Sequence, residues 1–140
     1  MNDRKYDLQE RLIDFAVLSI DVTEALPSTR AGNHVAGQLL RSATSPAPNY
    51  AEARAAESQN DFVHKMKVSL KELRETDVWL EIIRRKGYLS GSQHLTKALD
   101  ECDQLTAIFV KSIETAKAKA RSSEVRDGAP PAEYAPPSDF

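Results

Sequence analysis

Apolar residues recur every three or four positions along four long stretches of this sequence, and such spacing is typical of helices that bury one side. The first stretch shows the pattern most clearly, because Leu8, Leu12, Phe15, Val22 and Leu26 fall on one face of a helix. Residues that break or cap helices separate the stretches. Together these signals predict helices near residues 7–26, 30–58, 61–86 and 92–119.

Four helices of comparable length with short connections predict an all-α fold, an antiparallel up-down-up-down four-helix bundle. The 140 residues suffice for one domain, and they include only four Phe, four Tyr and one Trp, which suits helices better than sheets. We expect the bundle to occupy residues 1–119. Residues 120–140 are rich in Pro and poor in large apolar side chains, which predicts a disordered tail.

Two prolines, Pro46 and Pro48, fall inside the second predicted helix. In a helix interior each would remove a backbone hydrogen bond and clash with the preceding turn, at ~3 kcal/mol apiece. The penalty is smaller if Ser45 caps a new helical segment whose first turn contains both prolines, with the Ser45 hydroxyl accepting from the Ala47 N–H. The sequence therefore predicts a second helix that is kinked or broken around residues 44–48.

No motif supplies a catalytic or metal-binding constellation. The five glycines are scattered, so the sequence has no phosphate loop. A ferritin-like metal site requires paired Glu-x-x-His units, and only Asp61-Phe62-Val63-His64 comes close. Cys102 lies on the core stripe of the fourth helix, where a thiol acts as a small apolar group. We expect no enzymatic activity, no cofactor and no metal.

Net charge argues against a general polyanion-binding protein. The chain carries 19 basic and 21 acidic residues, and the excess of two acids falls within the last twenty residues. The bundle is therefore neutral, and no net field draws it to nucleic acid or to an anionic membrane. The single cysteine favours a reducing compartment, and no stretch approaches the ~20 apolar residues that span a bilayer. We expect a cytoplasmic protein without membrane contact.

A second apolar stripe on the first helix consists of Ile13, Val17 and Ile20. It indicates either a deeply packed helix or a subunit contact. The second helix adds a surface of small residues, so the two helices offer more apolar face than one bundle core requires. We expect a homo-oligomer.

Two groups of polar residues are candidates for contacts with a partner. Asn49, Tyr50 and Glu52 follow the prolines, and Asn49 either bonds carbonyls that the prolines free or faces a partner. The third predicted helix has more cations than any other, and acidic residues alternate with them, which favours a solvated face. The cations singled out are Lys67, Lys71, Arg74, Arg84, Arg85 and Lys86.

Several segments occur in an order that is itself informative. They are residues 38–46 (QLLRSATSP), 49–53 (NYAEA), 57–58 (ES), 61–62 (DF), 70–76 (LKELRET) and 79–80 (WL). This series resembles the four helix bundle protein family, also called the 23S rRNA intervening-sequence protein family, over roughly residues 6–118. The resemblance implies a four-helix bundle and a ring-shaped homopentamer, and it carries over no catalytic residues.

The series is also similar to the accessory bundle protein of diversity-generating retroelements, which binds nucleic acid and a reverse transcriptase through a basic surface. The neutral bundle of this chain departs from that pattern. We therefore predict a non-enzymatic oligomeric adaptor that presents a surface to another protein, through residues 45–50 or the proline-rich tail. The alternative is an RNA-binding accessory protein, in which a ring of subunits multiplies a weak basic patch.

Overall fold

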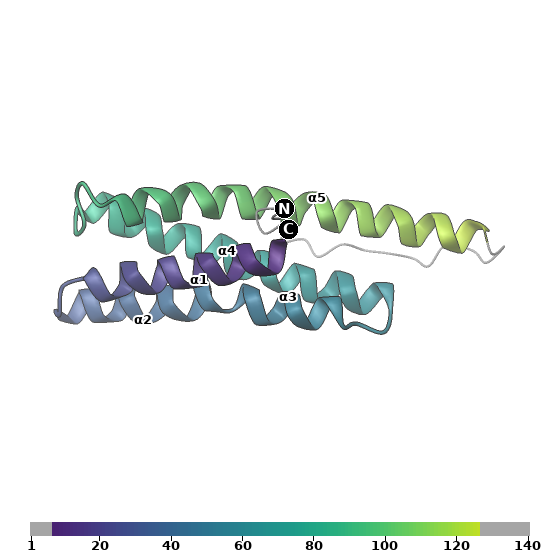
Figure 1. Cartoon of the computed structure of the whole chain (residues 1–140), viewed down its shortest axis with the longest axis horizontal. Helices are drawn as coiled ribbons and strands as arrows, with labels where there is room; N and C mark the ends of the chain where they lie inside the picture. The colour runs from purple at the N-terminus through teal and green to yellow at the C-terminus, as the bar shows by residue number, and fades with distance from the viewer. Residues whose placement is uncertain (1–6, 127–140) are drawn as a thin grey trace, which may run out of the picture.

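The computed structural model describes residues 7–126, and all regular secondary structure in that range is helical. The elements are α1 (Leu8–Ala25), α2 (Arg30–Thr44), α3 (Pro46–Arg54), α4 (Gln59–Lys86) and α5 (Gln93–Arg126). Figure 1 shows α2 and α3 following one another beside α1 and α4, while α5 lies along α4. The predicted all-helical fold is confirmed for the described residues.

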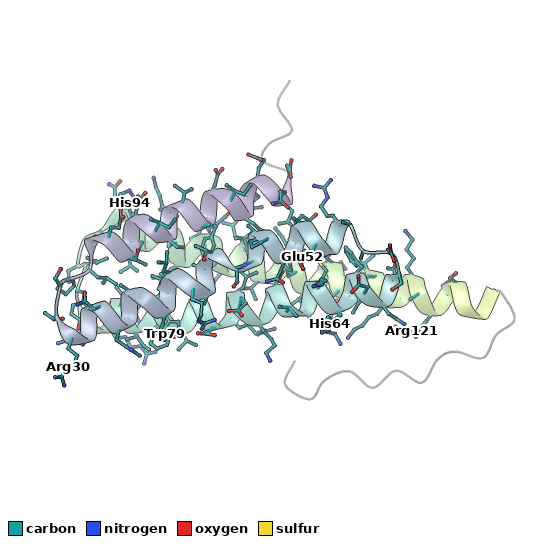
Figure 2. The ribbon with its side chains drawn as sticks, turned by 90° about the horizontal axis from the view of Figure 1, so that it is seen from below. Arg30, Glu52, His64, Trp79, His94 and Arg121 are labelled. Atoms are coloured by element: carbon teal, nitrogen blue, oxygen red, sulfur yellow. The ribbon has the colours of Figure 1, made fainter. Side chains whose placement is uncertain are left out.

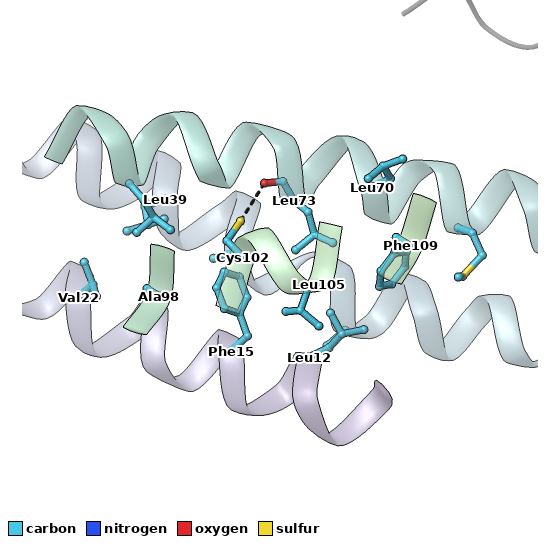
Figure 3. Close-up of a cluster of buried hydrophobic side chains, with 14 of the residues drawn as sticks. Leu12, Phe15, Val22, Leu39, Leu70, Leu73, Ala98, Cys102, Leu105 and Phe109 are labelled. Atoms are coloured by element: carbon cyan, nitrogen blue, oxygen red, sulfur yellow. Dashed lines mark hydrogen bonds between the residues drawn. The ribbon is translucent and has the colours of Figure 1, made fainter. Parts of the chain in front are cut away.

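The core lies where the apolar faces of the helices meet. Phe15 of α1, Leu39 of α2, Leu73 of α4 and Phe109 of α5 are all fully buried there, as Figure 3 shows. Ser19 fills a slot in the stripe of α1 and is buried as well. The stripes that the sequence predicts for the first and last helices therefore form the core.

Side chains and glycine define the helix ends. Asp7, Thr29 and Ser58 each accept a backbone N–H from the first turn of the helix that follows, at 3.3, 3.0 and 3.0 Å. Ser58 thus starts α4 two residues before the predicted start. Gly87 ends α4 in the left-handed conformation (φ 77°), which glycine adopts without steric strain.

The boundary between α2 and α3 falls at Ser45, but the predicted cap is wrong. Ser45 has helical backbone angles and its side chain makes no capping hydrogen bond. The backbone instead passes through Ser45 in helical geometry, and the Asn49 N–H donates to the Ser45 carbonyl at 3.2 Å. Helical geometry at Ser45 takes its hydroxyl away from the Ala47 N–H, so Ser45 does not act as a cap.

The last helix is longer than the sequence predicts. It continues to Arg126, past the expected end of the bundle at residue 119. Residues 120–126 contain neither Gly nor Pro, and several of them favour helix, so nothing in this stretch stops the helix. The remainder of the predicted disordered tail, residues 127–140, lies outside the described residues.

Two glycines of α2 provide a matched test of the turn between α1 and α2. A Cβ atom on the buried Gly32 would collide with the Pro27 carbonyl oxygen, whereas a Cβ on the exposed Gly37 would meet nothing within 4 Å. We expect Gly32→Ala to lower the free energy of unfolding by ~1–3 kcal/mol. Gly37→Ala should raise it by ~0.5–1 kcal/mol, since alanine favours helix. Urea unfolding measures both, and shifts of the same sign would contradict the packing of this turn.

Candidate interaction surfaces

The residues after the prolines make contacts within the chain. The Asn49 side-chain amide donates to the Ser45 carbonyl at 3.0 Å. Of its two expected roles, Asn49 therefore takes that of bonding a backbone carbonyl near the prolines. The Tyr50 ring packs edge-on against Phe109, with 5.9 Å between ring centroids, and burial raises the pKa of Tyr50. Internal packing therefore accounts for the residue types at both positions.

Glu52 is exposed on α3, and Figure 2 shows its position near the start of α4. Its carboxylate accepts from Lys65 Nζ at 2.7 Å and so joins α3 to α4. The pair is accessible to solvent, and exposed ion pairs contribute little stability. A partner could therefore replace either half of the pair at small cost.

Two of the three cations at the end of α4 form hydrogen bonds with one carboxylate. Arg84 and Arg85 both donate to Glu81, and these hydrogen bonds lower the pKa of Glu81 to about 2. Lys86 Nζ lies 5.6 Å from the centroid of the Tyr88 ring. These three cations also lie where positive charge stabilises the carboxyl end of a helix.

Two acidic residues of α4 pair with an arginine of α2. Arg41 of α2 donates to Glu72 at 3.2 Å and also pairs with Glu75. Glu75 in turn accepts from the Trp79 indole N–H at 3.0 Å. These contacts turn Glu72 and Glu75 towards α2. The carboxylates of these two acidic residues, which alternate with cations in the sequence, therefore lie on the α2 side of the helix.

Lys67, Arg74 and Lys117 line a groove of about 170 Å³ between α4 and α5, together with Glu114. The walls are apolar and consist of Leu70, Val110 and Ile113. Lys67 is only 8% exposed, so the prediction of a solvated face is wrong at this position. Its aliphatic stem is long enough to pack along apolar surface while the amine stays at the rim.

Several branched apolar side chains lie at the surface. On α1 Ile13 is 40% and Val17 54% exposed, while Ile20 is half-buried. Deep packing of the second stripe is therefore wrong, and the subunit-contact reading stays a prediction. On α4 Val78 is 56% and Ile82 40% exposed, although the apolar spacing of this helix places Ile82 beside its core line.

Two surface residues, Val78 and Arg41, were not predicted from the sequence. Val78 follows Lys71 and Arg74 at helical spacing, and this spacing could have placed it on their face. Arg41 had no such signal, because its partners Glu72 and Glu75 are more than thirty residues away in the chain. Only the rotation of α2 against α4 brings the three side chains together.

Clusters of metal-ligating side chains are absent from residues 7–126. No group of three or more His, Cys, Asp or Glu side chains in this range could hold a metal ion. His34 packs edge-on against Trp79 at 6.0 Å between centroids, whereas His64 and His94 lie far apart in Figure 2. None of the helices in this range is both long and apolar enough to cross a membrane.

Cys102 is buried, and its thiol donates to the Leu73 carbonyl at 3.3 Å, as the dashed line in Figure 3 marks. Burial raises the pKa of this thiol to about 12, and the charges of Asp77 and Asp103 add to the effect. Because the thiolate is the nucleophilic form, the side chain is inert at neutral pH. It acts as a core residue.

The fold and these surfaces define an all-helical protein that exposes both apolar and charged side chains. The family model described as 23S rRNA-intervening sequence protein matches residues 4–111. The chain therefore belongs to the 23S rRNA-intervening sequence protein family. Among curated proteins none matches the chain.

A solved structure agrees with this assignment. It is a protein of unknown function from the S23 ribosomal protein family of Bacteroides thetaiotaomicron, which is 27% identical to this chain. The match covers 76% of this chain and 97% of the other, with a TM-score of 0.69. Neither the family description nor this relative assigns a catalytic activity.

The Cys102 thiol provides a test of core packing. We expect the folded protein not to react with a thiol reagent at pH 8. Labelling should then proceed only as fast as global unfolding exposes the thiol. Above pH 9 the unfolded thiol ionises while the folded one stays protonated up to about pH 12. Unfolding then releases a proton, so stability should fall as pH rises through this window. Cys102→Ala should remove that part of the slope, and rapid labelling of the native protein would contradict the burial.

Proposed function

We propose that the protein is a non-enzymatic, homo-oligomeric bundle that acts as an adaptor by presenting a surface to another protein. The observation that carries the proposal is the exposure of branched aliphatic side chains on α1 and α4. Ile13 and Val17 stand one turn apart on α1, as Val78 and Ile82 do on α4. Such clusters on a soluble domain mark contact sites, because contact removes their apolar area from water.

The proposal includes the arrangement of the helices. Short turns join α1 to α2 and α4 to α5, and neighbouring helices in Figure 1 run in opposite directions. This supports an up-down-up-down antiparallel bundle in which α2 and α3 form one rod that is kinked at Ser45. The resemblance described above favours five subunits arranged as a ring.

Glu52 and the α4 cations are the proposed contact residues for a protein, which is either a separate partner or a second copy of the chain. Glu52 is exposed at the α3–α4 corner, and Arg74 is exposed on α4. Asn49 and Tyr50 fit this role less well, because both have partners inside the chain.

Oligomer formation is the first test of the proposal. We expect light scattering at micromolar concentration to return a mass well above the 15.5 kDa of one chain. A ring of five would give about five times that mass. The measurement should be repeated after nuclease treatment, so that bound nucleic acid does not add to the mass. A value near 15.5 kDa would refute the oligomer.

RNA binding is the second candidate, and one observation favours it. Arg41 pairs with Glu72 and Glu75 and turns these acids towards α2, while Lys71 and Arg74 are exposed on α4. Lys117 of α5 lies on the same groove as Arg74. A ring would repeat this small patch in every subunit, and repetition raises avidity.

A salt titration separates the two candidates. Phosphate contacts release counterions, so RNA affinity should fall steeply between ~50 and ~200 mM salt. We expect only weak binding of ribosomal RNA fragments at the upper concentration. Submicromolar binding that is steeply salt-dependent would favour RNA instead. In that case Lys71→Gln/Arg74→Gln should weaken it more than Arg84→Gln/Arg85→Gln, whose arginines Glu81 already holds.

A further inference from the structure

The outer face of α1 combines apolar and acidic side chains. Gln9 donates to the Ala47 carbonyl on one flank of this helix, and Arg11 pairs with Glu101 of α5 on the other, at 2.7 Å. The surface between the two flanks carries Ile13 and Val17. Four acidic residues accompany this apolar pair: Glu10 precedes it, Asp14 lies between its two members, and Asp21 and Glu24 follow it.

The outer face of α4 has the same layout with the opposite charge. Val78 and Ile82 form the apolar pair, preceded by Lys71 and Arg74 and followed by Arg85 and Lys86. Glu81 also lies near this face, but Arg84 and Arg85 hold it. The other acids of this part of α4, Glu72 and Glu75, face Arg41.

Charge on the two faces is available for contacts between molecules. Within residues 7–126 neither Asp21 nor Glu24 has an ion-pair partner, and the same holds for Arg74. All three side chains are exposed. An intermolecular ion pair formed by any of them would therefore not have to displace an internal one.

The two faces lie on opposite corners of the bundle. Helix α1 contacts α2, α3 and α5, and α4 contacts the same three helices, but α1 and α4 do not contact each other within the described residues. Each face is therefore directed away from the other. A single molecule cannot bring its own two faces together, but two molecules can.

We infer that the outer face of α1 in one copy binds the outer face of α4 in a second copy, so that subunits join head to tail. Charge complementarity selects this pairing. A two-fold dimer through either face would set acids against acids or cations against cations at contact distance, where like charges repel. A contact between two different faces instead leaves one free face at each end, and it closes into a ring or extends as a filament.

Helix direction is compatible with a ring. In Figure 1 α1 and α4 run in the same direction, and rotation about an axis along the bundle preserves that direction in the next copy. The contacting helices are then parallel. With Val17 opposite Ile82, Ile13 lies opposite Val78. One turn further on, Asp21 lies opposite Lys86.

The inference rests on the proposed oligomer, and mixing two variants tests it. Val17→Lys places a cation in the acidic face of α1, and Val78→Glu places an acid in the basic face of α4. Both positions are more than half exposed, so the fold should tolerate the changes. We expect each variant alone to have a mass near 15.5 kDa. Ala107→Lys, at an exposed position of α5, should retain the wild-type mass.

The mixture decides the arrangement, because each variant keeps one intact face. We expect an equimolar mixture of the Val17→Lys and Val78→Glu proteins to associate, to a complex of at least twice the mass of one chain. Circular dichroism and a melting curve should show that both variants fold. Folded variants that stay monomeric when mixed, variants that form dimers alone, or a Val78→Glu protein of wild-type mass would each overturn the inference.

The same measurements distinguish failure of the inference from failure of the proposed function. A wild-type protein near 15.5 kDa would refute the oligomer and the inference together. An oligomeric wild-type protein whose variants fail to pair would refute only the arrangement of faces. Dissociation of the wild-type oligomer by nuclease would show that RNA holds the subunits together, and it would also overturn the direct contact.

Discussion

Packing of α4 against α5 fixes the direction of every other side chain on α4. Leu73, Leu80 and Ile83 are fully buried, and Leu105 and Phe109 of α5 are buried with them. Side chains keep fixed angular positions around a helix, so this buried line directs residues 74, 78 and 82 outward. Glu75 lies seven positions before Ile82, and its ion pair with Arg41 turns its carboxylate towards α2. The placement of charge on α4 therefore depends both on the core and on the contacts of Arg41.

Local sequence signals predicted the core and most helix ends, because both depend on residues that are close in the chain. Apolar spacing placed Phe15 in the core, and Asp7 and Thr29 cap the helices that follow them. The partners of charged residues could not be predicted in this way. Arg41 meets Glu72 only because α2 and α4 pack with a particular rotation, which no local pattern specifies.

The region of the prolines shows how tertiary contacts override a local rule. Pro46 and Ala47 are buried, so a cap that turned the backbone outward at Ser45 would lose apolar contacts. Side chains instead donate hydrogen bonds to backbone carbonyls at the boundary between the two helices. The Asn49 amide bonds the Ser45 carbonyl at 3.0 Å, and the Thr44 hydroxyl bonds the Leu40 carbonyl at 2.7 Å. The chain keeps helical geometry through the boundary, which favours a kinked rod over two separate helices.

The neutral charge of the bundle conceals two faces of opposite sign. Helix α1 carries four carboxylates against Arg11 alone, whereas cations outnumber acids on α4. At physiological salt a charge acts over only ~8 Å, so an approaching molecule responds to the nearest face and hardly to the total. If the two faces are to bind each other, their charges must largely cancel, and a bundle built from both is then close to neutral. Neutrality therefore argues against wrapping by a long polyanion, and it agrees with association between copies of the same chain.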